Sequence, residues 1–275
     1  MPVSPEALAA NLEHEMGANT GFVRIHAAEA LIEHGYGFKV APVLLSDAEV
    51  ETPGYRLGVW RALAQIVKAE SERRDYVGRI RRVLTDAAAP DRLGAAESLA
   101  KLRVADRNDR PVLEEWLRSA KESDAPFLLW LLLLSSDSNE RPQDEARLAR
   151  LLDSKDPAAR LRAGYALGRL GDASAESIRH LQQCAESEPA DSRARVYLLA
   201  AAFRYAPLDS PPAARLKREL IADFASSDAS EQLQASTAIG AHGSAEDIPA
   251  LTSLLKSANA DARIGAAGAL LHLLR

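Results

Sequence analysis

Hydrophobic residues recur along the chain in eight short segments that share one template. Each segment has an anchor position, usually arginine, followed by an apolar residue at +1, a small or branched residue at +3 and Leu, Ile or Ala at +7. These offsets place the apolar residues on one face of an α-helix. The eight anchors are Arg24, Arg56, Arg92, Pro126, Arg160, Arg193, Gln232 and Arg263.

The spacing between successive anchors is 32, 36, 34, 34, 33, 39 and 31 residues. Periods of this length are typical of a two-helix unit that is repeated along a solenoid. The anchored segments predict the inner helices, near residues 23–35, 55–67, 91–103, 126–136, 159–171, 192–205, 231–242 and 261–274. Amphipathic stretches between them predict the outer helices, at 75–84, 112–119, 145–152, 176–184 and 247–255. We therefore expect an all-α fold, a right-handed α-solenoid of about eight two-helix repeats that forms one domain over residues 1–275.

Local signals support these boundaries. Asp156, Asp228 and Asn259 each lie four residues before an anchor, where they are expected to cap the inner helix. The 39-residue interval contains the proline-rich stretch 205–212, which predicts one longer loop and not a domain boundary. The fourth segment, APFLLWLLL, is apolar nearly all round, so its helix is either buried on both sides or exposes an apolar patch.

Two stretches carry a family resemblance. The sequences DPAARLRAGYALGRLGD at 156–172 and NADARIGAAGALL at 259–271 resemble the bacterial HEAT-like repeat named after the phycobilisome lyases. GFVRIHAAEAL and ETPGYRLGVWRAL, in the first third, resemble bacterial HEAT proteins found with sugar and solute uptake systems. The resemblance implies the fold over most of the chain, but it does not select a function, because such repeats serve lyases, scaffolds and regulators alike.

Composition restricts the candidate chemistry. The formal net charge is -5, so the sequence disfavours a nucleic-acid partner, whose binding would require a local basic stripe. Cys184 is the one cysteine, so we expect neither an intramolecular disulfide framework nor a cysteine-based zinc site. The first residues lack the charged lead and apolar run of a signal peptide, and the longest apolar run, 126–134, is too short to span a bilayer. These observations predict a cytoplasmic protein without membrane insertion.

The positions at +2, +5 and +9 from each anchor are expected to form the concave surface, because they lie opposite the +3 and +7 residues. In the middle of the array this surface is predicted to combine guanidinium groups, a phenol and leucines, a set that suits an acidic peptide, a carboxylate or a phosphate. The residues of this primary candidate site are Leu128, Leu131, Arg162, Tyr165, Arg169 and Arg195. The alternative interpretation is that these arginines are solvated helix-surface residues.

A second polar cluster is predicted nearer the N-terminus. Glu29, Arg61 and Glu97 occupy the same position in consecutive repeats and alternate in sign, which indicates either a solvated charge ladder or a polar pocket. His26 lies three residues before Glu29 and could be oriented by that carboxylate. Three aromatic residues, Trp60, Trp130 and Tyr197, alternate with small residues at the +4 position, which favours packing between repeats over ligand stacking.

Enzyme motifs are not evident in the sequence. The sequence lacks the repeated His-Glu pairs of the HEAT-type deoxyhypusine hydroxylases. The HEAT-like alkylpurine glycosylases have a basic concave face, whereas acidic residues occur here at the positions that are expected to form the concave surface. His180 lies four residues before Cys184, so a Cys-His pair is geometrically possible, although a buried packing thiol is the preferred interpretation. We expect neither a cofactor nor a bound metal.

The sequence therefore predicts a non-catalytic binding or scaffold protein that presents its concave surface to a protein or peptide partner. The alternative is a lyase-like or accessory enzyme subunit. The last segment, IGAAGALLHLLR, has no polar capping helix after it, so homo-oligomerisation through this end is a further possibility. Leu270, Leu271 and Leu274 could then face a partner or a missing domain.

Overall fold

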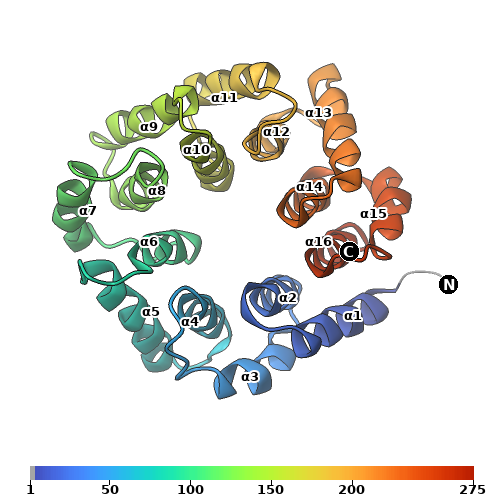
Figure 1. Ribbon diagram of the computed structural model, residues 1–275, viewed down its shortest axis with the longest axis horizontal. Helices are drawn as coiled ribbons and strands as arrows, with labels where there is room; N and C mark the ends of the chain where they lie inside the picture. Colours follow the sequence, from blue (N-terminus) through green and yellow to red (C-terminus); the bar gives the residue numbers. More distant parts are fainter. Residues whose placement is uncertain (1–3) are drawn as a thin grey trace. The chain divides into compact units, whose positions relative to one another are not determined.

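A computed structural model describes residues 4–275, and over this range the chain is all-α, without strands (Figure 1). The helices are α1 (Pro5–Ala18), α2 (Gly21–Glu33), α3 (Gly37–Ser46), α4 (Tyr55–Ile66), α5 (Glu70–Thr85), α6 (Arg92–Lys101), α7 (Arg110–Leu117), α8 (Ala125–Ser135), α9 (Arg141–Arg150), α10 (Pro157–Leu170), α11 (Ala175–Ser187), α12 (Arg195–Tyr205), α13 (Pro211–Ala222), α14 (Ala229–His242), α15 (Ile248–Leu254) and α16 (Ala260–Leu273). None of these helices is long and apolar enough to cross a membrane.

The even-numbered helices coincide with the eight predicted inner segments, because the apolar residues at +3 and +7 of each template face the core. The predicted N-caps are confirmed: the side chains of Asp156, Asp228 and Asn259 each accept a hydrogen bond from the backbone N–H two residues later. The proline-rich stretch does not simply lengthen a loop. Pro211 and Pro212 begin α13, where a missing N–H costs no helical hydrogen bond.

Contacts divide the chain into two compact units, where the sequence predicts one domain. Unit 1 combines the two ends of the chain, residues up to Arg74 and Ala206–Arg275, whereas unit 2 is the continuous segment Asp75–Tyr205. Helix α5 begins in unit 1 and continues into unit 2. Unit 1 therefore depends on contacts between residues that are more than 200 positions apart in sequence.

Each unit contains four even-numbered helices that lie side by side (Figure 1). Their order is α14, α16, α2 and α4 in unit 1, and α6, α8, α10 and α12 in unit 2. Glycines permit some of these helices to approach closely: a Cβ added to Gly240 of α14 would lie 2.5 Å from the Ala269 Cα of α16. Odd-numbered helices pack along these layers, and the side chains between the two layers form the core.

The anchor arginines bind helix ends together. Arg160 donates to the Ser154 carbonyl that follows the preceding outer helix, and its Nε and second terminal nitrogen donate to Glu188 at the C-terminal end of the next outer helix, α11. Arg24 makes the same pair of connections, to the Met16 and Asn19 carbonyls and to Asp47 at the end of α3. Arg24 and Arg160 thus have a structural role, because each connects one helix pair to the next.

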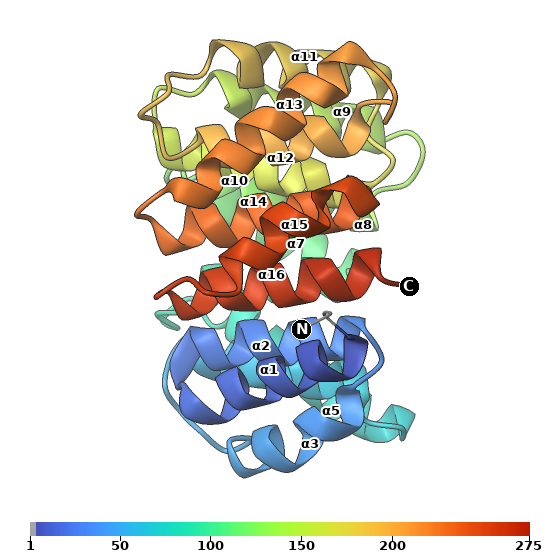
Figure 2. The ribbon, with the colours of Figure 1, turned by 90° about the vertical axis from the view of Figure 1, so that its right-hand side faces the viewer.

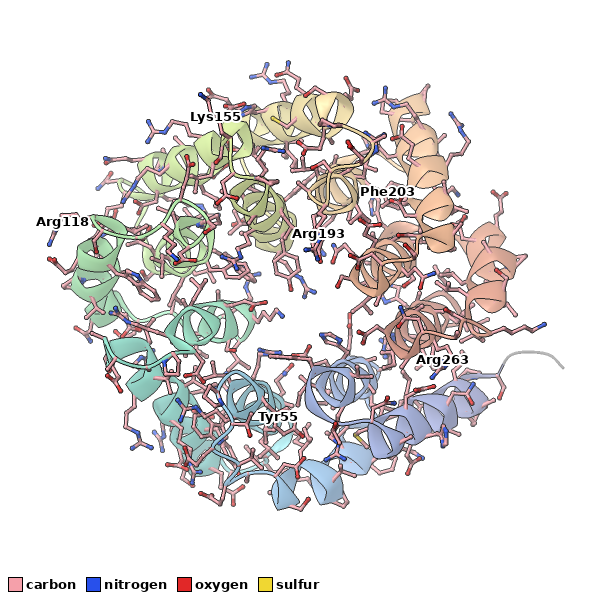
Figure 3. The ribbon with its side chains drawn as sticks, viewed as in Figure 1. Tyr55, Arg118, Lys155, Arg193, Phe203 and Arg263 are labelled. Atoms are coloured by element: carbon pink, nitrogen blue, oxygen red, sulfur yellow. The ribbon has the colours of Figure 1, made fainter. Side chains whose placement is uncertain are left out.

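The same connection joins the two ends of the chain. Arg263 of α16, labelled in Figure 3, donates to the Ser257 carbonyl. It also forms a bidentate ion pair with Glu15 of α1, at 2.6 and 2.9 Å. Helix α16 lies beside α1 and α2 in both ribbon views (Figures 1 and 2). Helices α1 and α2 thus pack against α16 as a following helix pair packs against the pair before it elsewhere in the chain.

This packing covers the C-terminal leucines that we expected to face a partner. Leu270 and Leu271 are buried, and Leu274 is partly buried. Helix α16 needs no polar capping helix because α1 and α2 cover it. We based the expectation of homo-oligomerisation through this end on exposed leucines, and these leucines are covered.

The apolar fourth segment is buried and exposes no patch. Helix α8 contacts α6, α7, α9 and α10, and Leu128 and Leu131, which we expected on the concave surface, have no exposed area. The expectation is wrong because helices of the same layer pack against the sides of α8. The positions at +2 and +5 therefore face neighbouring helices as well as the free surface.

Candidate binding site

Tyr165, on α10, lies at the centre of a group of aromatic rings in unit 2. Its ring meets those of Phe127, Trp130 and Tyr197 edge to face, with centroids 6.2, 6.0 and 6.3 Å away. Such edge-to-face pairs are favourable, because the positive edge of one ring meets the negative face of another. Trp130 is buried beneath the group, whereas Tyr165 and Tyr197 remain partly exposed. Helices α8, α10 and α12 each contribute to this surface.

Two cations flank the Tyr165 ring. The Lys101 Nζ from the last residue of α6 lies 5.6 Å from its centroid, and the Arg169 Cζ lies 5.1 Å from it. Both distances are within the range of cation–π attraction. Lys101 also forms an ion pair with Glu97, at 2.8 Å. We call the six residues Lys101, Phe127, Trp130, Tyr165, Arg169 and Tyr197 the Tyr165 cluster.

The ends of α6 and α10 meet at this cluster. Arg103, just after α6, donates from its guanidinium to the Arg169 and Leu170 carbonyls, at 3.4 and 3.3 Å. These carbonyls belong to the last turn of α10, where they have no partner within the helix. Arg103 has a φ of 53°, an uncommon conformation for a residue other than glycine. The contact fixes the position of Arg169 relative to Lys101.

One buried polar group lies within the cluster. The Trp130 indole Nε1 has no hydrogen-bond acceptor among residues 4–275. A buried donor without an acceptor costs about 1–3 kcal/mol, so such groups are rare in folded proteins. Their occurrence is easier to explain at a functional surface than in a purely structural core.

The other predicted arginines of the primary site have protein partners. Arg162 lies over the Phe127 ring and donates to the Ser123 carbonyl and to the Asp124 carboxylate, at 2.7 and 3.1 Å. Arg195 donates to the Glu188 carbonyl at the end of α11, at 2.7 Å. Of the predicted residues, the structure therefore brings Tyr165 and Arg169 together, with Arg162 at the edge. It assigns Arg195 to a helix terminus, as it does the anchor arginines.

The second predicted cluster is divided between the two units. In unit 1 the Arg61 Nε donates to Glu29 at 2.6 Å, and Arg61 is buried. Glu97 belongs to unit 2. His26 is oriented by Asp261 of α16, with 2.9 Å between Nδ1 and Oδ1, and not by Glu29 as expected. No local sequence signal could indicate a partner 235 residues away.

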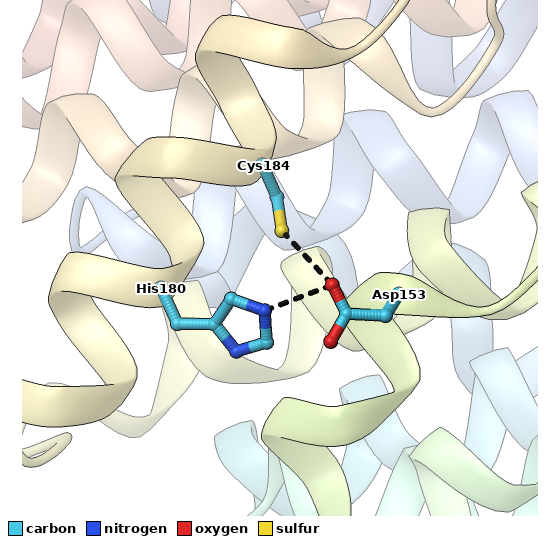
Figure 4. Close-up of side chains that lie close together, drawn as sticks. All are labelled: Asp153, His180 and Cys184. Carbon is cyan, nitrogen blue, oxygen red and sulfur yellow. Dashed lines mark hydrogen bonds and ion pairs between the residues drawn. The ribbon is translucent and has the colours of Figure 1, made fainter.

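Cys184, on α11, is not the buried packing thiol that we expected. It is partly exposed and faces Asp153, the last residue of the 3-10 turn Leu151–Asp153, with 3.8 Å between Sγ and Oδ1 (Figure 4). Burial and the neighbouring Asp153 raise the pKa of Cys184 to about 11. The thiol is therefore protonated at neutral pH, which argues against a cysteine nucleophile, because the thiolate is the reactive form.

Sequence reasoning missed Lys101 and Phe127 as members of the Tyr165 cluster, and it favoured a packing role for Trp130 and Tyr197. Lys101 stands at +9 from its anchor, the same position as Arg169, but the two residues belong to helices separated by α8. Their shared +9 position was the one signal that could have indicated that they lie close together. Whether two such residues meet depends on how strongly the layer formed by α6, α8 and α10 curves, which the sequence does not specify.

Comparisons with known proteins add little to this geometry. No protein-family model matches the sequence, and no curated protein matches it. Among solved structures, the crystal structure of an engineered protein, a target of the Northeast Structural Genomics Consortium, covers 71% of this chain and 95% of its own length. The identity is 19% and the TM-score 0.40, so this likeness supports no conclusion about function.

Proposed function

We propose that this chain is a HEAT-type repeat protein that binds an acidic peptide segment of a partner at the Tyr165 cluster. The eight inner-helix segments, the repeated arginine connection between helix pairs and the period of 31–39 residues support the repeat assignment. Within this proposal the even-numbered helices of unit 2 form the binding surface, and the chain acts as a non-catalytic scaffold.

A single observation carries the choice of partner: a partly exposed tyrosine ring has a lysine on α6 and an arginine on α10 beside it. A carboxylate placed between these cations would gain charge-assisted hydrogen bonds, and the guanidinium of Arg169 can bind it in bidentate geometry. The aromatic rings offer apolar area to the neighbouring residues of the same peptide. A peptide that alternates acidic and leucine residues meets both requirements.

The test is a calorimetric titration with a synthetic peptide of alternating Glu and Leu, beside a peptide with Gln in place of Glu. We expect binding of the acidic peptide only, and at least a tenfold loss of affinity in the double variant Lys101→Ala/Arg169→Ala. A tenfold loss corresponds to about 1.4 kcal/mol. The affinity should also fall with added salt, because opposite charges attract each other less in salt.

The matched control removes two other cations from unit 2. Arg118 and Lys155 are exposed and project outward from the layer of odd-numbered helices (Figure 3). The variant Arg118→Ala/Lys155→Ala has the same net charge as the test variant and should bind the peptide within about twofold of the wild type, since exposed charges contribute little. Equal weakening in both double variants, or equal binding of the Gln peptide, would refute the proposal.

A further inference from the structure

Asp153, His180 and Cys184 bring three different metal-ligating groups together at the surface of unit 2 (Figure 4). The His180 Nε2 lies 3.0 Å from Asp153 Oδ1, the Cys184 Sγ lies 3.8 Å from the same oxygen, and all three ligand atoms lie within 4.8 Å of one another. We call these residues the Cys184 cluster. They have no part in the Tyr165 cluster or in the function proposed for it.

The helical spacing explains two of the three positions. His180 and Cys184 are four residues apart on α11, so their side chains project from the same face of the helix, one turn apart. The third group, Asp153, ends the 3-10 turn that follows α9. A ligand held by all three would therefore connect two successive outer helices.

Two of the three ligand separations, those from Asp153, are close to the separations in a tetrahedral zinc site. Zinc bonds of about 2.0–2.3 Å to N, O and S at tetrahedral angles require an N–O separation of about 3.4 Å and an S–O separation of about 3.6 Å. The observed 3.0 and 3.8 Å differ from these by a few tenths of an ångström. Small rotations of the three side chains can change the distances by this amount without movement of either helix.

The donor set also favours zinc over the hard cations. Thiolate and imidazole are ligands for zinc and similar transition metals, whereas magnesium and calcium prefer oxygen alone. An ion can reach the cluster, since the Asp153 side chain is 65% exposed and His180 is 29% exposed. The nearby Arg160 does not oppose a cation strongly, because its guanidinium is held by both oxygens of Glu188.

We propose that the Cys184 cluster is a zinc site with three protein ligands and a water molecule in the fourth position. On binding, the Cys184 S–H bond breaks, its proton passes to solvent, and the sulfur lone pair forms the Zn–S bond. The His180 Nε2 now donates its proton to Asp153, so the ring must carry its proton on Nδ1 when Nε2 binds the metal. One thiolate and one carboxylate then balance the charge of Zn²⁺.

Cobalt is the spectroscopic probe, because Co²⁺ takes the same ligands as zinc. Titration of the full chain with Co²⁺ should produce a thiolate-to-cobalt charge-transfer band in the near ultraviolet with one ion per chain, and added Zn²⁺ should remove it. Since Cys184 is the one cysteine, the variant Cys184→Ser should lose the band completely. His180→Ala and Asp153→Asn should each weaken binding at least about tenfold, whereas the exposed His14→Ala control should leave it unchanged.

A second measurement needs no variant. Zn²⁺ at saturating concentration should slow the alkylation of the Cys184 thiol by iodoacetamide, and Mg²⁺ at the same concentration should not. Failure of Co²⁺ to produce the band, or equal affinity in the His180→Ala variant, would overturn the proposal, as would unchanged alkylation. Circular dichroism of each variant checks that a lost signal reflects a lost ligand and not an unfolded chain.

Discussion

At the scale of single residues, the polar side chains that link one helix to another determine more of the arrangement than the apolar side chains of the core. Apolar spacing was sufficient to predict which residues of α10 face the core. It could not predict that Arg195 serves a helix end while Arg169 lies beside Tyr165, because both are arginines on helical surfaces. That difference depends on which carbonyl or ring lies within reach, and this is set by the neighbouring helix.

Glycine provides a test at this scale. Gly240→Ala should destabilise the protein by about 1–3 kcal/mol, because the added Cβ would lie 2.5 and 2.6 Å from the Ala269 Cα and Cβ and would push α14 away from α16. The matched change Gly78→Ala, where nothing lies within 4 Å of the new Cβ, should stabilise α5 by roughly 0.5–1 kcal/mol. Urea unfolding of both variants measures the difference. Equal effects would contradict the close packing of α14 and α16.

At the scale of helices, much of the arrangement follows from the sequence. The even-numbered helices lie at the predicted segments, and the N-caps of α10, α14 and α16 were predicted individually. The burial of Leu128 and Leu131 was not predicted, because helical periodicity shows which face is apolar but not how many neighbours a helix has. Likewise, nothing in the sequence near Arg263 indicates that its carboxylate partner stands at position 15.

The ion pair between α16 and α1 can be measured by a double-mutant cycle. Arg263→Gln and Glu15→Gln should show a coupling energy of about 0.5–3 kcal/mol, because Glu15 is nearly buried and both of its oxygens accept from Arg263. The exposed pair Arg79–Asp75, four residues apart on α5, should show at most about 0.5 kcal/mol. Similar coupling in the two pairs would mean that the α16–α1 connection is no stronger than a surface pair.

The same pair predicts how stability depends on pH. The hydrogen bond from Arg263 outweighs burial and lowers the pKa of Glu15. A carboxyl group with a lowered pKa in the folded state contributes stability above its unfolded pKa of about 4.3 and loses it as the pH falls through the folded value. Unfolding free energy should therefore decrease below about pH 5, and less steeply in the Glu15→Gln variant. A parallel decrease in both proteins would exclude Glu15 as a contributor.

At the scale of the whole molecule, the important feature is that unit 1 is built from both ends of the chain. Helix α1 buries Leu8, Leu12 and Met16 against its neighbours, which include α16. Neither the repeat period nor the composition predicts this arrangement, since a linear array with two free ends has the same period. The expectation of an exposed C-terminal helix arose from assuming such free ends.

Removal of residues 1–19 tests this arrangement. Loss of three buried side chains, each worth about 1.5–3 kcal/mol, should lower the unfolding free energy by at least about 4 kcal/mol and the melting temperature by roughly 10 °C. The uncovered face of α16 should also promote self-association, which light scattering detects against the full chain at equal concentration. A truncated chain that keeps its melting temperature and its oligomeric state would show that α1 does not support α16.

The joining of the two ends also has a consequence for synthesis on the ribosome. Unit 2 consists of consecutive residues, so the whole unit has been translated once Tyr205 has left the exit tunnel. Helices α1 and α2 are made before unit 2, yet they cannot complete their packing until α16 has been released. These two helices therefore wait for a partner throughout the translation of unit 2.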